Sequence, residues 1–422
     1  MKNAIFRHLG AFILSVVFAI GFLLLGACLP QDPIDANVLA SAEGMILQGN
    51  YPRMADHAFA SILDYTTDSL ILSESKATTI SQWDTIFTNP LFHYETGEEI
   101  PLNDLYQYAL DDDPQPTGYY VQYWMGFRPV MRLLLTFLDY YQILRYVAFA
   151  FFVLFAAVMC SLAKETGTKT AFLFALSIIL VRPHVIAVSL QFSCCFFIAF
   201  LAMLLVPRLH RHAKWESLFF LELGILTMYF DFYTTPILTY GLPMIYLYLL
   251  KTRDGTRGAL KSIGINAASW SAGYGFMWLA KLVLTSALTE ADGVGTGFAS
   301  FAGRVGIEKV SGMEAYYSPV AALRTVAASL YSDQQGKLIL FGAVALGFIL
   351  LLIRFLKDRH SPRELLQHKA LLVIAALPII WFIAAAQPTA NHHWFQYRGI
   401  AVSFWAGFVY LQYLLDRQTA AK

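Results

Sequence analysis

Apolar segments long enough to cross a lipid bilayer recur along almost the whole of this 422-residue chain. A membrane-spanning helix needs about 20 predominantly apolar residues, and the first such segment extends from Gly10 to about Leu29. Nine further candidates follow, at approximately 143–163, 170–187, 187–206, 217–235, 237–250, 262–287, 338–353, 370–386 and 399–415. The pattern predicts an all-α polytopic membrane protein with about ten transmembrane helices.

The composition agrees with this interpretation and excludes several classes of protein. Charged residues make up only 14% of the chain, whereas soluble domains contain about 25%. The 30 Lys and Arg residues balance the 29 Asp and Glu residues, so the chain lacks the excess of basic residues that a nucleic-acid binder needs. The sequence also lacks a glycine loop with Lys that would cradle a nucleotide phosphate. We therefore expect no nucleic-acid partner and no ATP or nucleotide-sugar chemistry.

The charges sort by segment, which predicts the orientation of the chain in the membrane. Fifteen acidic residues lie within 30–126 against two basic ones, Arg53 and Lys76. Eighteen Lys and Arg residues, with only six acidic ones, lie in short segments near 2–7, 164–169, 208–216, 251–261, 354–369 and 416–422. Basic loops stay in the cytoplasm. This distribution predicts a multi-pass protein of the bacterial cytoplasmic membrane with both termini in the cytoplasm.

Five regions follow from the expected spans. They are a first transmembrane helix (1–29), an extracytoplasmic loop with interfacial helices (30–142), a transmembrane core (143–287), a second extracytoplasmic loop (288–337) and C-terminal transmembrane helices (338–422). Cys28 follows Leu25-Gly26-Ala27, as in a bacterial lipoprotein signal. The apolar run before it is long enough to span a membrane, so we interpret it as the first transmembrane helix.

Two amphipathic helices are expected beside the first extracytoplasmic loop. From Asp35 to Gln48 the apolar residues share one face, and Gly49 stands where a helix ends. In the second, from Phe127 to Arg145, a polar stripe on an otherwise apolar helix predicts a position in the membrane interface. An alternative is that this helix is the outer end of the second span. The stripe consists of Arg128, Arg132, Thr136, Asp139, Gln142 and Arg145.

This order of elements resembles that of the GT-C glycosyltransferases. The resemblance covers about the first 250 residues as a layout, and Gly49-Asn50-Tyr51-Pro52 is similar to the region after the first span in members that transfer aminoarabinose or mannose. It implies a sugar donor linked to polyprenyl phosphate and a glycan or lipid acceptor on the outer membrane face. Four short motifs also resemble bacterial multi-pass proteins without an assigned function: Thr67-Asp68, Tyr123-Trp124-Met125-Gly126, Asp231 to Pro236, and Trp394 to Arg398.

Such a transfer needs a carboxylate to accept a proton or to hold a metal. The candidates are Asp35, Asp68 and Asp231. Asp35 lies just beyond the first span, where the resemblance places the base, but it also precedes an apolar helix as an N-cap would. Asp68 has a comparable alternative in the first turn of a helix, and Asp231 stands at the expected outer end of a span, where an ionisable residue tends to mark function.

Cations must hold the phosphate of the carrier. Arg398, Arg128 and Arg182 are the candidates, with His392 and His393 beside Arg398. An aromatic belt with an interfacial Arg anchor would explain the same cluster. Lys281, inside an expected span, needs an anionic partner, for which Glu222 is a candidate.

The sequence therefore favours an extracytoplasmic glycosyltransferase that modifies a cell-envelope glycan or lipid. Its expected partners are membrane lipids, a polyprenyl-phosphate-linked sugar, and a glycan or lipid acceptor, and the requirement for a divalent metal is left open. The alternatives are a transporter or flippase of envelope precursors and a non-catalytic assembly subunit.

Overall fold

The computed structural model describes residues 2–55, 59–77, 81–94, 101–255, 259–305, 318–330 and 367–420, together with Gly342, Leu346 and Ile349. Most of the span expected at 338–353 therefore lies outside the described residues. The described chain is mostly helical, which confirms the all-α class.

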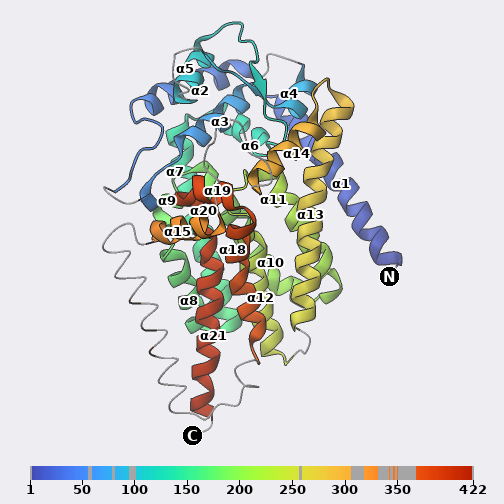
Figure 1. The fold of residues 1–422 in the computed structure, drawn as a ribbon, viewed down its shortest axis with the longest axis vertical. Helices are drawn as coiled ribbons and strands as arrows, with labels where there is room; N and C mark the ends of the chain where they lie inside the picture. The colour runs from blue at the N-terminus through green and yellow to red at the C-terminus, as the bar shows by residue number, and fades with distance from the viewer. Residues whose placement is uncertain are drawn as a thin grey trace.

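The first part of the chain forms a cap at one end of the molecule (Figure 1). It is connected by the long helix α1 (Lys2–Ala27) and consists of short helices and one antiparallel pair of two-residue strands. The cap contains α2 (Gln31–Ile46), η1 (Phe59–Ser61), α3 (Tyr65–Lys76), α4 (Gln82–Thr88), β1 (Pro90–Leu91), α5 (Pro101–Leu110), β2 (Gly118–Tyr119) and α6 (Arg128–Leu135).

The remaining helices extend away from the cap (Figure 1). They are α7 (Tyr140–Thr166), α8 (Thr168–Ile179), α9 (Pro183–Ile186), α10 (Leu190–His210), η2 (Ala213–Trp215), α11 (Glu216–Phe230), α12 (Ile237–Arg253), α13 (Ala259–Leu288), α14 (Gly293–Arg304), α15 (Pro319–Leu330), α18 (Lys369–Ala384), α19 (Ala386–Asn391), α20 (His393–Gln396), η3 (Tyr397–Ile400) and α21 (Ala401–Ala420).

Three of the described helices are long and apolar enough to cross a membrane: Ile5–Ala27 within α1, Tyr140–Thr166 and Leu190–His210. Helices also occupy the other expected spans that are described, but they are shorter or less apolar. This finding agrees with the membrane character expected from the sequence. The number of about ten spans stays a prediction.

In the sequence, Arg182-Pro183-His184 interrupts the apolar region 170–206, and the helix breaks there. Helix α8 ends at Ile179, and Arg182 adopts a left-handed backbone with φ 61° before Pro183 begins α9. Proline cannot donate the hydrogen bond that would continue a helix, and it also disfavours helical geometry in the preceding residue. Ser189 then caps α10 by accepting a hydrogen bond from the Phe192 amide at 3.3 Å.

The expected interfacial helix at 127–145 is wrong in two respects. The segment is divided between α6 and α7, and Asp139 begins α7 with a capping box that includes Gln142. Arg128 and Arg132 of the expected polar stripe are buried, with 4% and 2% of their surface exposed. The side chain of Arg132 donates to the carbonyl oxygens of Gly26 at 2.8 Å and Ser75 at 2.7 Å. These arginines therefore satisfy backbone carbonyls and carboxylates within the cap.

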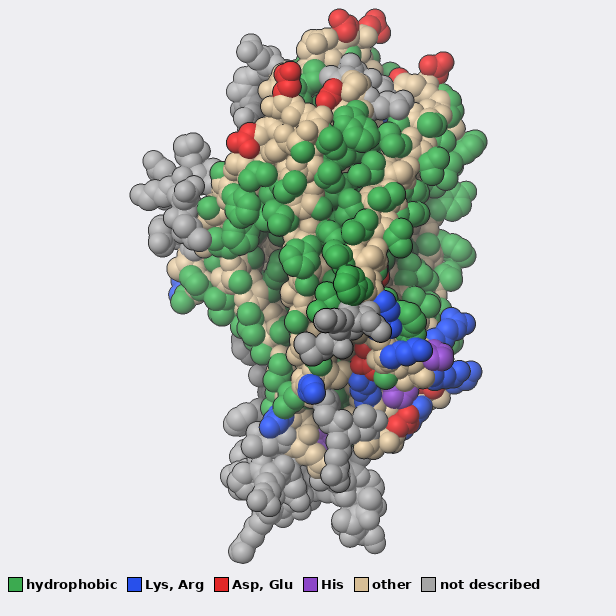
Figure 2. Space-filling model, turned by 90° about the vertical axis from the view of Figure 1, so that its right-hand side faces the viewer, with side chains coloured by type: hydrophobic (Ala, Val, Ile, Leu, Met, Phe, Trp, Pro, Cys, Tyr) green, Lys and Arg blue, Asp and Glu red, His purple; other side chains and the backbone are tan. Residues whose placement is uncertain are grey.

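Charged side chains gather at opposite ends of the molecule. Figure 2 shows most acidic side chains at the cap end and most Lys and Arg side chains beyond an apolar band. At the basic end, the Arg7 guanidinium lies 4.8 Å from the centre of the Trp215 ring, and Lys251 pairs with Glu216 at 2.6 Å. Arg253 likewise contacts Glu165 at 3.4 Å. Four of the segments expected in the cytoplasm, near 2–7, 164–169, 208–216 and 251–261, thus lie next to one another.

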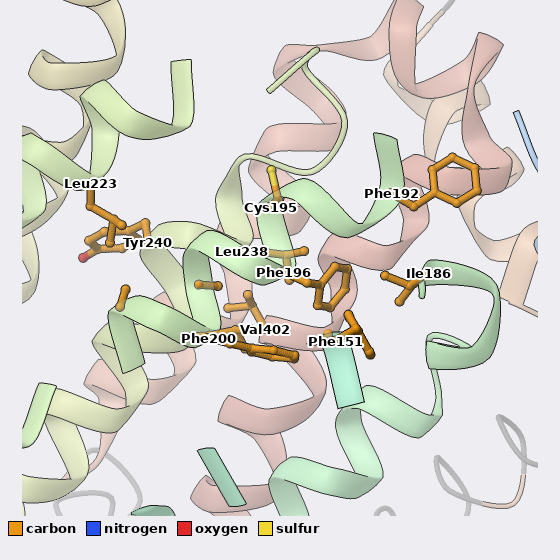
Figure 3. Close-up of a cluster of buried hydrophobic side chains, with 14 of the residues drawn as sticks. Phe151, Ile186, Phe192, Cys195, Phe196, Phe200, Leu223, Leu238, Tyr240 and Val402 are labelled. Carbon is orange, nitrogen blue, oxygen red and sulfur yellow. The ribbon is translucent and has the colours of Figure 1, made fainter. Parts of the chain in front are cut away.

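Helix α10 forms the centre of the apolar core (Figure 3). Its Phe196 and Phe200 rings pack against Phe151 of α7, with ring centres 6.1 and 5.5 Å apart. Helices α11 and α13 approach still more closely at Gly224 and Gly273. A Cβ atom at either position would collide with the backbone of the facing helix, so the absence of a side chain allows this approach. Small residues allow this kind of approach between membrane helices. The core therefore brings these helices into close contact beneath the cap.

Candidate functional site

A cavity of about 720 Å³ lies where the cap meets the long helices. Figure 1 places α14, α19 and α20, which contribute to its walls, between the α2–α5 layer and the long helices. Its volume falls in the range typical of small-molecule sites. The lining residues are Thr67, Leu70, Tyr120, Tyr123, Gln191, Phe232, Tyr233, Thr296, Ala299, Ser300, Gly303, Arg304, Gln387, Pro388, His392, Phe395 and Gln396. We call this cavity the cap pocket.

Aromatic rings form one wall of the cap pocket. The Tyr123 ring centre lies 4.9 Å from that of Tyr120, 5.2 Å from that of Phe232 and 5.8 Å from that of Tyr233. The segment that carries Tyr123 is fixed to α11, because the Gly126 amide donates to the Tyr229 carbonyl at 2.9 Å. Any side chain at Gly126 would collide with Tyr229. Aromatic faces of this kind accept flat apolar surfaces and cations.

Arg304 is the one Lys or Arg among the lining residues of the cap pocket. Its Nη2 donates to the Tyr123 hydroxyl at 2.7 Å, and its guanidinium lies 4.5 Å from the centre of the Tyr233 ring. These contacts hold the cation against the aromatic wall. A guanidinium in this position can donate to phosphate or carboxylate oxygens.

Helix α14 presents two different faces. Thr296, Ser300 and Arg304 recur every four residues and line the cap pocket, which is the helical spacing of one face. Phe298 and Phe301 lie on another face, with 48% and 44% of their surface exposed. The helix therefore separates a polar cavity from an apolar outer surface.

Two glutamine side chains line the cap pocket with an unsatisfied oxygen. Gln191 and Gln396 are 4% and 2% exposed, and neither Oε1 atom has a hydrogen-bond partner among the described residues. Gln396 Nε2 donates to the Tyr233 carbonyl at 2.6 Å. The two amides thus add neutral polar side chains to the wall of the cap pocket.

His392 lines the cap pocket, and His393 does not belong to the lining. The His392 ring stacks on Phe395 with the ring centres 5.3 Å apart. The crowded pocket wall lowers the pKa of His392 by desolvation, and the nearby Arg304 and His393 lower it further. Its imidazole is therefore neutral at pH 7. His393 Nδ1 instead contacts the Ser329 hydroxyl at 2.6 Å.

Four of the residues expected in the site gather behind the cap pocket, around the start of α10. Asp68 accepts hydrogen bonds from the Tyr140 hydroxyl at 2.6 Å, the Leu190 amide at 3.3 Å and the Gln191 amide at 3.1 Å. Burial raises the pKa of Asp68 to about 7, although these three hydrogen bonds oppose the shift. Asp68 thus caps α10 and holds the backbone of Gln191 at the pocket wall.

The other three residues near α10 also have internal contacts. The Arg398 guanidinium lies 4.3 Å from the centre of the Phe192 ring and donates to the Ala60 carbonyl at 3.1 Å. Both oxygens of Asp231 lie 3.1 Å from the Thr234 amide, which stabilises the turn that carries Phe232 and Tyr233. Arg182 stands at the break between α8 and α9. None of these side chains belongs to the pocket lining.

Arg128 and Asp35 lie elsewhere in the cap. Arg128 pairs with Glu74 and also donates to the Thr85 carbonyl at 3.0 Å. Nearby, Lys281 Nζ donates to the carbonyls of Ile86 and Phe87 at 2.7 and 2.8 Å. We call Glu74, Arg128 and Lys281 the buried charge cluster.

Two smaller expectations about charged residues also differ from the structure. Glu222 is not the partner of Lys281, because its carboxylate accepts a hydrogen bond from Ser15 at 2.8 Å. Asp35 lies inside α2 rather than at its N-cap, since α2 begins four residues earlier, and it contacts Lys76 at 3.6 Å.

The pocket residues that sequence reasoning missed carry a weak signal. Gln191 falls inside an expected span and carries no charge, and Gln396 stands in the sequence as one amide within an aromatic cluster. Arg304 falls in the loop expected at 288–337, where a spacing of four from Thr296 and Ser300 would have indicated a helix face.

Among the described residues, no group of three or more His, Cys, Asp and Glu side chains is arranged to hold a metal ion. No protein-family model, curated protein or solved structure matches the chain. The function is therefore inferred from the cap pocket itself.

Proposed function

We propose that this chain is an integral membrane glycosyltransferase that uses a polyprenyl-phosphate-linked sugar. The single observation that carries the proposal is the cap pocket, which combines a guanidinium, aromatic rings and amide groups with a wall, α14, whose other face is apolar and exposed. A lipid-linked sugar phosphate has three parts that complement these groups: a phosphate for the guanidinium, a sugar for the aromatic rings and amides, and a lipid for the apolar face. The GT-C-like order of elements supports the same class.

The lining residues suggest how such a donor would be held. Arg304 would contact the phosphate, since a guanidinium donates to phosphate oxygens in a fixed planar geometry. Tyr123, Phe232 and Tyr233 would pack against the sugar ring. The lipid chain would leave the pocket past Phe298 and Phe301 of α14, which already expose apolar surface.

The transfer step requires a group that accepts the proton of the acceptor hydroxyl. His392 has a neutral imidazole in the pocket, and burial lowers its pKa to about 4. It would therefore be a weak base that accepts the proton only as the attacking hydroxyl becomes acidic in the transition state. The new glycosidic bond would form as the bond between the sugar and the carrier phosphate breaks, and the phosphate would leave on the lipid beside Arg304. Asp68 and Asp231 would act as positioning residues, because their carboxylates support the walls that carry Gln191 and Tyr233.

The orientation in the membrane is part of the proposal. The cap would face the outside of the bacterial cytoplasmic membrane, and the basic end, with both termini, would face the cytoplasm. About ten spans would connect the two sides. The acceptor would be a glycan or lipid of the cell envelope.

The decisive experiment measures binding and turnover of a synthetic polyprenyl-phosphate hexose by the purified full chain in lipid nanodiscs. We expect Arg304→Gln to reduce binding at least tenfold, because a charge-assisted contact to phosphate is lost. Arg211→Gln is the matched control, since Arg211 is exposed at the opposite end of the molecule. Equal binding by both variants and the unaltered protein would reject the proposed site.

A second candidate function is binding or transport of the lipid-linked sugar without transfer. The hydrogen bonds within the protein favour it, because Asp68 and Asp231, the carboxylates behind the pocket, already accept from Tyr140 and Thr234. Binding of the donor without release of polyprenyl phosphate, in the presence of envelope acceptors, would support this candidate over the enzyme.

A further inference from the structure

Two cations share one aromatic ring at the basic end of the molecule. The Arg7 guanidinium lies 4.8 Å and the Lys214 ammonium group 5.7 Å from the centre of the Trp215 ring. Both cations are exposed, and so is 39% of the surface of Trp215. Figure 2 shows Lys, Arg and His side chains gathered just beyond the apolar band on this side of the molecule. We call Arg7, Lys214 and Trp215 the basic-end cluster.

The cluster is assembled by the packing of α1 beside α11. Arg7 belongs to α1, whereas Lys214 and Trp215 belong to η2, directly before α11. His8 Nε2 lies 3.1 Å from the hydroxyl oxygen of Ser217, which joins the start of α1 to the first turn of α11. Segments more than 200 residues apart in the sequence therefore bring their cations to the same ring.

The nearby carboxylates contact other groups. Glu216, directly after Trp215, is buried and accepts a hydrogen bond from Lys251 at 2.6 Å. Among the described residues, neither Arg7 nor Lys214 forms an ion pair. Like charges repel each other, so an anion beside the two cations would be attracted by both. The other described carboxylates of this end have partners too: Glu222 contacts Ser15, Asp254 contacts His210 and Arg253, and Glu165 contacts Arg253.

An apolar strip on α1 lies next to the basic-end cluster. Phe6, Leu9 and Ile13 are exposed, and their spacing of three and four residues places them on one face of the helix. The helix is also one of those long and apolar enough to cross a membrane. An occupant of the cluster would thus meet cations at one end and membrane-facing apolar surface at the other.

We infer that the basic-end cluster binds the phosphate of an anionic phospholipid in the membrane leaflet at the basic end. Arg7 and Lys214 would donate to phosphate oxygens, and Trp215 would lie at the level of the head groups, where tryptophan is enriched. The acyl chains would lie along the strip on α1. Basic side chains beside the end of a membrane span are typical of sites for anionic lipids. The inference goes beyond the proposed function, because the cap pocket lies at the other end of the molecule.

The test uses native mass spectrometry to count the phospholipids that stay bound to the purified full chain. The detergent contains equal amounts of phosphatidylglycerol, which carries a net negative charge, and phosphatidylcholine, which carries none, with the same acyl chains. We expect the unaltered protein to retain about tenfold more phosphatidylglycerol, because two basic residues attract the anionic head group. Equal retention of the two lipids would overturn the inference.

A pair of double variants separates the cluster from the general charge of this end. We expect Arg7→Gln with Lys214→Gln to reduce the preference to less than about threefold, because both cations are lost. The matched control is Lys164→Gln with Lys169→Gln, which removes two exposed cations from the connection between α7 and α8, on the side away from α1 (Figure 1). The control should keep the preference of the unaltered protein. An equal loss in both double variants would overturn a specific site.

Two further arms test the chemistry of the site. Arg7→Lys with Lys214→Arg keeps both charges and should keep the preference, whereas its loss would show that charge is not what the cluster supplies. An excess of soluble glycerol phosphate should not displace the lipid, because it cannot contact the strip on α1. Displacement would overturn the assignment to a phospholipid.

The proposed function is tested separately by the cap pocket. Arg304→Gln should leave the preference for phosphatidylglycerol unchanged, so that failure of the sugar donor to bind and failure of this inference give different results. A loss of the preference in Arg304→Gln would place the lipid in the cap pocket and overturn the inference.

Discussion

The cap pocket and the buried charge cluster use polar side chains in different ways. In the cluster, Arg128, Glu74 and Lys281 meet partners inside the protein. In the pocket, the lining has one cation, Arg304, and three neutral amide side chains, Gln191, Gln387 and Gln396. Charged residues buried in the cap thus serve to hold its helices together, whereas neutral amides and one arginine face the space where a ligand fits. The charge of a residue alone is therefore a poor guide to the site.

The largest expected effect breaks the buried charge cluster. Arg128→Met leaves Glu74 buried without its cation, and removing one partner of a buried ion pair destabilises a protein by about 3–5 kcal/mol. Thermal unfolding of the purified chain at fixed detergent concentration measures this loss. The double variant Glu74→Leu with Arg128→Met should recover part of it, because Glu74 is no longer buried without Arg128, and Lys281 keeps its two carbonyl partners. A single variant as stable as the unaltered protein would contradict a structural role for the pair.

The next effect depends on pH and concerns the wall behind the pocket. Burial raises the folded-state pKa of Asp68 from 3.8 to about 7, so the folded protein binds more protons than the unfolded chain between these values. The contribution of Asp68 to stability then falls as pH rises from about 4 to 7 and changes little above that range. A tenfold difference in proton affinity between the folded and unfolded states corresponds to about 1.4 kcal/mol.

Unfolding midpoints measured across this window test the assignment. Asp68→Asn should flatten the decline relative to the unaltered protein, whatever its effect on absolute stability. Asp113→Asn, an exposed carboxylate of the cap, should leave the profile unchanged. The same slope in both variants would show that Asp68 is not the titrating group.

The smallest stability effects are expected in the pocket. Gln191→Met removes a buried atom that has no partner among the described residues, so we expect the free energy of unfolding to change by less than about 1 kcal/mol or to increase. Arg304→Gln should cost about 1 kcal/mol, since one hydrogen bond to Tyr123 is lost. Loss of stability comparable to that of Arg128→Met would place these residues with the structural group and remove the contrast between the two regions.

Features determined by local sequence were predicted well. The break at Pro183 follows from the geometry of proline, and the segregation of acidic and basic segments is present along the long axis. The expected stripe at 127–145 was wrong because a spacing of four places Arg128 and Arg132 on one face but does not tell what that face meets. Glu74, the partner of Arg128, is 54 residues away in the sequence.

The candidate site was harder to predict for the same reason. Asp68, Asp231 and Arg398 stand out in the sequence as charges near expected span ends, and each lies close to the pocket with its hydrogen bonds directed into the protein. The roles assigned to them, to Asp35 and to Arg182 stay predictions. Gln191 and Gln396 can be recognised as pocket residues only in the structure, because the cap pocket is formed by contacts between distant segments.

The two faces of α14 have a consequence for how this protein must be handled. The twelve residues of α14 carry both Arg304 and the exposed Phe298 and Phe301. The lipid or detergent that contacts these phenylalanines therefore contacts the same helix that lines the cavity. Detergent micelles and bilayers of different thickness will contact the exposed face of α14 differently. We therefore expect head-group affinity to vary with the surrounding amphiphile, and native-like lipid is the medium in which it should be measured.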